Sequence, residues 1–358
     1  MTVAQTRERL HNHIFGSLAA AALGDALGAA TEQHTTDEIV AKFGGLLRDL
    51  HAPSTETFSV GNLPGQITDD VSQMLALAEA LIEANGDLNQ DAWLRALLRW
   101  MDTSPAARMM GPTTRPLLEA LAAGRDTADI GRSPYSTRKL ASFGATNGAA
   151  MRVAPAGMIF PGDLEAAVRL SWISCRPTHD TQIAAAAAGA IAAGVAQALL
   201  PSADVFSVAR ACMQGARLGE ALGARDGRRV PGPSVLRRIE IAIDEALRSA
   251  NLHEAITRIE ASVGNSVMAV ESVPAAVGIF VAAGGDPVEA VVGGANIGND
   301  TDTIAAMAGA MAGALRGVGA LPTPLLETVV SANREDLAAI ADGLATLAWC
   351  RLEAKPVG

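Results

Sequence analysis

The sequence GNDTDT at residues 298–303 leads directly into an apolar run, residues 304–315, made mainly of Ala, Gly and Met. Ala is the strongest helix former and its methyl group permits close packing, so the run predicts a buried helix. Asn299 or Asp300 is placed to cap this helix, with the carboxylates of Asp300 and Asp302 at its N-terminal end. A cap with favourable helix-dipole interactions is the simpler interpretation of this stretch.

A second stretch with the same chemistry, Thr68-Asp69-Asp70, begins another apolar run at residues 71–82. If the two stretches meet in the fold, four carboxylates share one site, and like charges that close remain ionised only beside cations. All the donors are hard oxygens without His or Cys, which favours magnesium or manganese over zinc. The repetition therefore favours a cation site over two separate helix caps.

The composition indicates the fold class. The chain has 358 residues, of which 49% are hydrophobic and only 3% aromatic. Because β-branched and aromatic runs are scarce, many closely packed helices are favoured over a sheet. No repeat, linker or change in composition divides the chain. We therefore predict an all-α protein, with one compact domain over residues 1–358 that is an orthogonal bundle of about a dozen or more helices.

Hydrophobic periodicity and turn residues place the helices. They are expected at residues 5–29, 37–43, 70–84, 91–101, 114–123, 164–174, 183–200, 203–222, 234–249, 252–262, 273–284, 286–292 and 304–315, with C-terminal helices at 324–353 that belong to the same domain as the motif-bearing region, about 14–316. Residues 124–143 are expected to be irregular. The Ser-, Thr-, Gly- and Pro-rich stretch 54–64 precedes Thr68 and is a lid candidate.

Charge and cysteine usage exclude several classes of protein. A formal net charge of −10 argues against a nucleic-acid-binding surface. The three cysteines lie far apart and indicate reduced thiols in a cytoplasmic protein; they are Cys175, Cys212 and Cys350. Asp25 and Glu32 interrupt the apolar N-terminal stretch, so a targeting signal is not expected. Residues 183–200 are dominated by Ala and Gly, which favours a buried helix over a membrane span.

The sequence FGATNGAAMR at residues 143–152 suggests a binding loop. Its Gly and Asn residues permit unusual backbone angles, so amide groups can point into a cavity and receive phosphate or sugar oxygens. A tight turn into a helix would have a similar sequence. His179 stands at the start of the long Ala-rich helix, where a capping or surface role is the plainer interpretation.

Four stretches in series resemble the ADP-ribosylglycohydrolase family, which includes the dinitrogenase-reductase-activating glycohydrolase. They are GDALG at residues 24–28 with Glu32, TDD at 68–70, NGAAMR at 147–152, and NDTDT at 299–303. The resemblance implies a compact all-helical fold with a binuclear magnesium or manganese centre. It also implies hydrolysis of N- or O-glycosidic bonds to ribose.

The resemblance also assigns roles to individual residues. Glu32 would lie near the scissile ribose, and the loop with Gly144, Asn147 and Gly148 would hold the ribose and diphosphate. His179 would face the phosphates, as an imidazolium donor. The implied metal ligands are Thr68, Asp69, Asp70, Asp300, Asp302 and Thr303. Two ions could orient the ribose and acidify a water that Asp302 positions, while Glu32 acts either as an acid/base or as a sugar-orienting group.

One departure from the family concerns the adenine. Some members carry an aromatic residue before the Asn-Gly, where this chain has Ala145 and Thr146, so Phe143 would have to replace it. Three functions remain open: removal of ADP-ribose from a modified protein side chain, arginine foremost; hydrolysis of a small N-ribosyl compound or nucleoside; and a catalytically silent structural or binding role. The six implied ligands argue against the last. The expected partner is an ADP-ribosylated protein or a small ribosyl substrate, and a monomer is expected.

Overall fold

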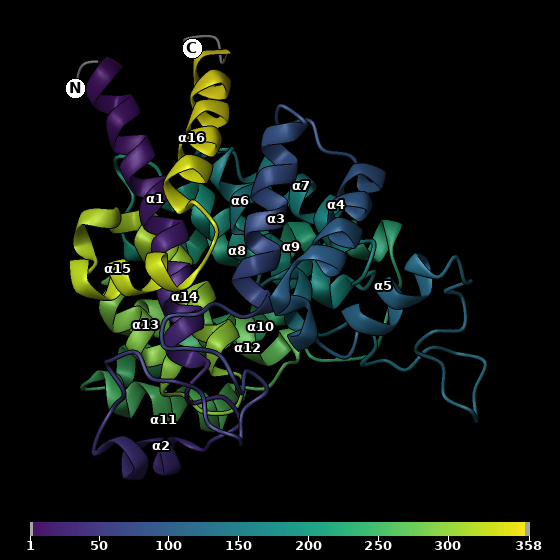
Figure 1. The fold of residues 1–358 in the computed structure, drawn as a ribbon, viewed down its shortest axis with the longest axis horizontal. Helices are drawn as coiled ribbons and strands as arrows, with labels where there is room; N and C mark the ends of the chain where they lie inside the picture. The colour runs from purple at the N-terminus through teal and green to yellow at the C-terminus, as the bar shows by residue number, and fades with distance from the viewer. Residues whose placement is uncertain (1–2, 355–358) are drawn as a thin grey trace.

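The computed structural model describes residues 3–354, within which it has sixteen α-helices and three short 3-10 helices (Figure 1). They are α1 (Val3–Gly28), α2 (Thr36–Phe43), α3 (Asp69–Glu83), α4 (Gln90–Thr103), η1 (Pro105–Met109), α5 (Thr114–Ala122), η2 (Asn147–Ala149), α6 (Ala154–Met158), α7 (Leu164–Cys175), α8 (Gln182–Ala198), α9 (Val205–Asp226), α10 (Val235–Arg248), α11 (Leu252–Val263), α12 (Ala269–Ala282), α13 (Pro287–Ala295), α14 (Thr301–Arg316), η3 (Val318–Ala320), α15 (Thr323–Ala332) and α16 (Leu337–Ala354). These residues form no strand, only three isolated β-bridges, which confirms the all-α class.

The predicted helices are present, although some begin or end at other residues than predicted. Helix α14 begins at Thr301 rather than at residue 304, and α9 continues to Asp226 rather than ending at 222. The short α6 was not predicted, because Pro155 interrupts the local pattern. Residues 124–143 form an irregular loop that projects from the body beside α5 (Figure 1), as expected.

Helices α1 and α14 form the centre of the molecule and touch without intervening side chains. A Cβ atom on Gly24 would lie 2.4 Å from the carbonyl oxygen of Ala305, and one on Gly28 would lie 2.5 Å from Cα of Asp302. Because only glycine fits at these two crossings, the end of α1 lies directly against the first turn of α14. The GDALG motif therefore fixes the distance between the chain after α1 and the GNDTDT stretch.

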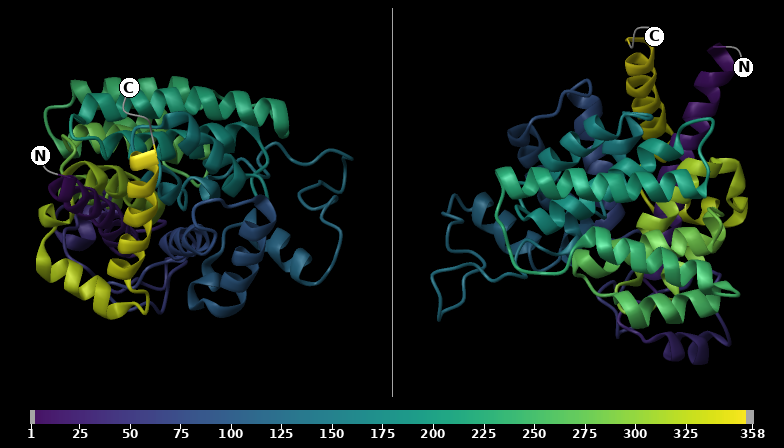
Figure 2. Two further views of the ribbon diagram at one scale, coloured as in Figure 1. Left: turned by 90° about the horizontal axis from the view of Figure 1, so that it is seen from above. Right: turned by 180° about the vertical axis from the view of Figure 1, so that it is seen from behind.

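The remaining helices surround this pair. Helices α8 and α9 lie side by side (Figure 2), where Gly189 and Gly215 make the close contact. Helix α8 is buried along nearly its whole length. Helix α16 lies beside α1 and α3 (Figure 1). Among residues 3–354, none of the helices combines the length and apolarity needed to cross a membrane. All three cysteines are free, and Cys175 and Cys212 are buried.

Candidate active site

The start of α3 is anchored on α1 through Asp25. This buried carboxylate accepts the backbone N–H of Thr68 with both oxygens, at 3.0 Å, and the N–H of Val71 at 3.2 Å. A carboxylate is favoured at a helix N-terminus because it satisfies free N–H groups and interacts well with the helix dipole. Asp25 therefore positions Thr68, Asp69 and Asp70 relative to α1, a role that the sequence analysis missed.

The start of α14 is joined to the segment that carries Glu32. The N–H of Gln33 donates to the carbonyl of Asn299 at 2.8 Å, and the N–H of Asn299 donates to the carbonyl of His34 at 2.9 Å. Asn299 adopts a positive φ of 57°, which suits Asn better than most residues. These reciprocal bonds hold Glu32 beside the first turn of α14.

Asp300 occupies the N-cap position of α14, but its side chain does not cap the helix. Its Oδ2 accepts a hydrogen bond from Nδ2 of Asn147 at 2.5 Å, and its Oδ1 accepts one from the hydroxyl of Thr303 at 3.3 Å. The carboxylate is thus turned toward the loop at 143–152. This contact links the GNDTDT stretch to the proposed sugar-binding loop.

One pocket brings most of the predicted site residues together. Its volume is about 90 Å³, and Phe58, Met109 and Met151 also line it. The predicted residues that line it are Glu32, Asp69, Asp70, Asn147, Gly148, His179, Asp300, Asp302 and Thr303. Thr68 is outside this lining; its hydroxyl accepts the N–H of Asp70 at 3.3 Å. Gly144 also lies outside it, where its carbonyl accepts from the hydroxyl of Thr181 at 2.7 Å.

Burial and mutual repulsion act on the carboxyl groups of the pocket and on Asp25 beside them. Burial, and then the charge of Asp302, raise the pKa of Asp69 to about 7 and that of Glu32 to about 10. Burial also raises the pKa of Asp302 to about 6, against the hydrogen bonds of Thr303 and Thr68. The same two causes raise the pKa well above its ordinary value in Asp25, Asp70 and Asp300. Protons or cations must therefore balance this cluster.

The donor chemistry of the cluster fits a divalent cation. Oδ2 of Asp70 is buried and has no hydrogen-bond partner, although buried carboxylate oxygens are normally satisfied. Carboxylate and hydroxyl oxygens are the donors that magnesium and manganese prefer. Within residues 3–354, however, no three Asp, Glu, His or Cys side chains are already gathered as a metal-binding group. The ligand set therefore stays a prediction.

Burial disfavours the charged form of His179, against the expected imidazolium. The ring is fully buried, and burial lowers its pKa well below the ordinary value. Its Nε2 lies 2.9 Å from the hydroxyl of Thr146, and its Nδ1 lies 2.8 Å from that of Thr178. A Cβ on Gly148 would come within 2.8 Å of the ring, so the NG motif packs directly on the imidazole. His179 therefore supports the loop as a neutral hydrogen-bonding group.

A buried arginine connects the two sides of the pocket. Arg152 donates from Nη1 to Oε1 of Gln73 at 2.8 Å, and Nε2 of Gln73 donates to Oδ2 of Asp69 at 2.9 Å. Nη2 of Arg152 donates to the hydroxyl of Thr178 at 2.7 Å, which in turn contacts His179. This chain of bonds fixes an acidic side chain and the loop-supporting histidine together. Sequence reasoning missed Gln73, although its position four residues after Asp69 places both on one helix face.

The aromatic side chain at the pocket is Phe58 rather than Phe143. Phe143 packs against Gly131 and lies under Nζ of Lys139, 5.7 Å from the ring centroid, outside the pocket lining. Phe58 belongs to the 54–64 stretch, and its side chain is 64% exposed at the pocket. Its N–H donates to Oε2 of Glu32 at 3.2 Å. The predicted lid segment thus touches the acidic residue nearest the proposed sugar.

The family model for ADP-ribosylglycohydrolase matches residues 6–352. YegU of Escherichia coli strain K12 is 31% identical over 343 residues, covering 93% of this chain and 96% of YegU. ADP-ribosyl-[dinitrogen reductase] glycohydrolase of Rhodospirillum rubrum is 32% identical, and the match covers 51% of this chain and 56% of that protein. Human ADP-ribosylhydrolase ARH3 is 26% identical, and the match covers 86% of this chain and 86% of ARH3. The solved structure of an ADP-ribosylglycohydrolase-related protein complex superposes with a TM-score of 0.67 at 25% identity, covering 95% of this chain and 99% of that one.

Proposed function

This chain belongs to the ADP-ribosylglycohydrolase family of glycosyl hydrolases, and from that premise we propose that it removes ADP-ribose from a modified protein side chain, arginine foremost. The observation that carries the proposal is the buried acidic cluster where α1, α3 and α14 meet, with the NG loop on its other side. A structural protein has no need of such a cluster, since buried like charges destabilise a fold. The silent alternative is therefore disfavoured.

Two divalent ions, magnesium or manganese, are proposed to bind between the starts of α3 and α14. The proposed ligands are Thr68, Asp69, Asp70, Asp300, Asp302 and Thr303. When bound, such ions supply Lewis-acid assistance by orienting ribose hydroxyls and increasing the acidity of water. The unpartnered oxygen of Asp70 supports this placement.

Asp302 and Glu32 are the proposed catalytic groups. Asp302 would accept a hydrogen bond from the attacking water and direct it at the anomeric carbon. Glu32, whose pKa burial and the neighbouring carboxylates raise to about 10 in the protein alone, would donate its proton to the leaving nitrogen as the glycosidic bond breaks. Cations nearby would lower that pKa toward the working range of a general acid.

Two observations support the smaller-substrate alternative. The pocket of about 90 Å³ is below the 300–1,000 Å³ that is usual for small-molecule sites, and no aromatic residue precedes the NG motif. A nucleoside or other N-ribosyl compound would need only the carboxylate end of the pocket. For ADP-ribose, Asn147, Gly148 and His179 would contact the ribose and phosphates, and Phe58 would offer the base a flat surface. A cytoplasmic location and a monomeric state remain predictions.

The two substrates are distinguished by measuring ADP-ribose and ribose as competing ligands of the metal-loaded protein. We expect ADP-ribose to bind at least about tenfold more tightly, which corresponds to about 1.4 kcal/mol from contacts beyond the sugar. Equal affinity of the two ligands would favour the nucleoside-type substrate instead.

A further inference from the structure

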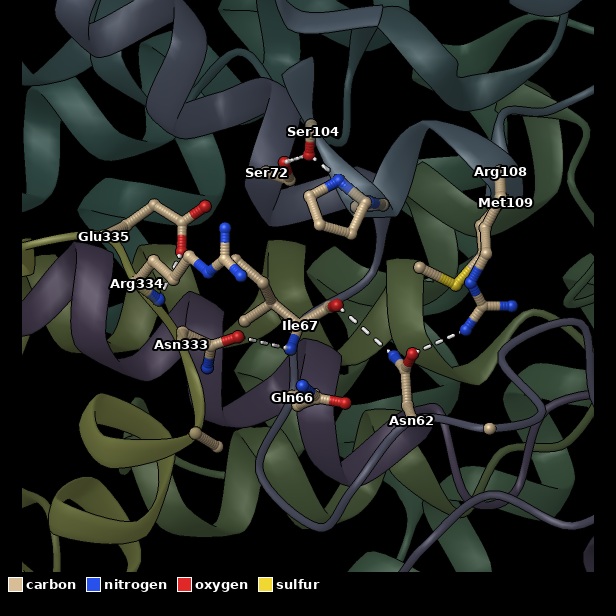
Figure 3. Close-up of a pocket in the computed structure, with 14 residues that line it drawn as sticks. Asn62, Gln66, Ile67, Ser72, Ser104, Arg108, Met109, Asn333, Arg334 and Glu335 are labelled. Carbon is tan, nitrogen blue, oxygen red and sulfur yellow. Dashed lines mark hydrogen bonds between the residues drawn. The ribbon is translucent and has the colours of Figure 1, made fainter. Parts of the chain in front are cut away.

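Figure 3 shows a second cavity, which has a volume of about 300 Å³ and shares a lining residue with the active-site pocket. Met109, at the end of η1, lines both. The other walls come from residues 61–67, the first turns of α3, η1, and the segment 332–335 between α15 and α16. Unlike the active-site pocket, this cavity has the volume of an ordinary ligand site.

Two asparagines hold the rim of the cavity in place. Oδ1 of Asn333 accepts the N–H of Ile67 at 3.1 Å, and its Nδ2 donates to the carbonyl of Gly65 at 2.8 Å. On the other side, Nδ2 of Asn62 donates to the carbonyl of Ile67 at 3.4 Å. The backbone just before Thr68 is therefore fastened from both sides, so the cavity is formed before any ligand binds.

The cavity carries two guanidinium groups that have no carboxylate partner among the residues that the structure describes. Nη2 of Arg108 donates to the amide oxygen of Asn62 at 2.7 Å, and the side chain of Arg334 makes no hydrogen bond or ion pair in residues 3–354. Figure 3 shows Arg108 and Arg334 on opposite sides of the cavity. The carboxylate of Glu335, which also lines it, accepts the backbone N–H of Arg334 at 3.0 Å. In a chain of net charge −10, this pair marks an anion-binding position.

The cavity adjoins the acidic end of the active site. Ile67, which lines it, directly precedes Thr68, and Ser72 lies one turn into α3. Gly148 and His179, which line the active-site pocket, do not line this cavity. When the scissile glycosidic bond lies at the carboxylates, the acceptor that it joins to the ribose also lies at the carboxylates, on the side of this cavity. The cavity is therefore placed for the acceptor and not for the ADP moiety.

The cavity continues as a groove away from the active site. A further hollow of about 400 Å³ between α3 and α4 shares Ser72, Ser104 and Arg334 with it. Glu79 and Glu83 line this far part, and Glu83 is paired with Arg99 at 2.9 Å. A long groove suits an extended chain. Arg108 lines only the part near the active site, Arg334 and Glu335 line both parts, and Glu79 and Glu83 line only the far part.

We propose, on the basis of the function proposed above, that this groove binds the peptide segment that carries the ADP-ribosylated side chain. Arg108 and Arg334 bind an Asp or Glu carboxylate of the segment close to the modified residue, through charge-assisted hydrogen bonds. Glu79 and Glu83 disfavour further acidic residues at the far end of the groove.

The test uses the metal-loaded full-length protein and two ADP-ribosyl-arginine peptides, one with Asp and Glu beside the modified residue and one with Asn and Gln there. Free ADP-ribosyl-arginine is the third substrate. We expect kcat/KM to be about three- to tenfold higher for the acidic peptide, as partly exposed charge pairs contribute modestly. The double variant Arg108→Gln/Arg334→Gln should lose this preference through KM, with kcat and the reaction of ADP-ribosyl-arginine unchanged.

The control is Arg210→Gln/Arg217→Gln, which removes the same charge from exposed positions on α9 and should keep the preference. An acidic preference that survives in the Arg108/Arg334 variant would overturn the proposal. Equal losses of kcat/KM on all three substrates would also overturn it. Competitive inhibition by inorganic phosphate as strong as that by the acidic peptide would overturn it too, because the cavity would then be a simple anion site.

A binding measurement separates this proposal from the proposed reaction. Fluorescence polarisation with labelled, unmodified acidic and amide peptides requires no catalysis. Tighter binding of the acidic peptide, lost in the Arg108/Arg334 variant, supports the groove even if ADP-ribosyl-arginine is not cleaved. Equal binding of the two peptides contradicts the groove even if the hydrolysis is confirmed.

Discussion

Asp302→Ala will lose binding of at least one divalent ion and reduce turnover by about 10³-fold or more. Asp302 is the common neighbour of the cluster, since its charge contributes to the raised pKa of Glu32, Asp69 and Asp300. A divalent ion contributes several kcal/mol to a transition state, and about 4 kcal/mol corresponds to 10³-fold in rate. Calorimetry on metal-stripped protein, with turnover on ADP-ribosyl-arginine, measures both effects.

The control for this substitution is Asp286→Ala. Asp286 is also an aspartate at a helix start, where it caps α13 by accepting two backbone N–H groups. Its loss should cost about 1 kcal/mol of stability through the cap and leave metal binding unchanged. An Asp302→Ala protein that binds manganese as tightly as the parent would exclude Asp302 as a ligand.

Glu32→Gln will lower kcat by about 10²-fold or more and leave metal affinity nearly intact. The amide oxygen of Gln can still accept the N–H of Phe58 that Glu32 accepts at 3.2 Å, so the local structure is kept while the proton is lost. In the parent, the acid must be protonated, so kcat falls as pH rises through the Glu32 pKa. That alkaline fall should be absent from the variant.

Glu56→Gln provides the matched control for Glu32. Glu56 lies in the 54–64 stretch, which contacts Glu32 through the N–H of Phe58. Its own carboxylate is exposed and paired with His34 at 3.1 Å, so its substitution should leave kcat unchanged. Loss of metal from Glu32→Gln would make Glu32 a ligand. A raised KM with an unchanged pH profile would make it a sugar-orienting group.

The sequence predicts the helical framework well because the helices are rich in residues, above all Ala, that strongly prefer the helical conformation. Ala- and Gly-rich helices are stabilised by packing closely against one another. The contact of Gly24 and Gly28 in α1 with the backbone of α14 is an example of such packing. The meeting of the two Asp/Thr stretches was also predictable. Each stands at a helix start, and their shared chemistry requires a common counter-charge.

The features that the sequence did not predict depend on contacts between distant segments. From the sequence, Asp25 is only a charge within an apolar stretch and one residue of the GDALG motif, whereas in the fold it is a capping acceptor for α3. The pKa of His179 depends on burial by other segments, which lowers it and disfavours the expected imidazolium. Phe58 lies too far from the NG motif in sequence to be recognised as the aromatic residue of the pocket.

Release of ADP-ribose from ADP-ribosyl-arginine is the most direct test of a metal-dependent ADP-ribosyl hydrolase. Purified protein is incubated with this compound and with a panel of nucleosides, in magnesium, in manganese and in excess chelator. The predicted result is release of free ADP-ribose that requires a divalent cation, with slower or no cleavage of the nucleosides. Cleavage of nucleosides alone, or hydrolysis that persists unchanged in chelator, would contradict it.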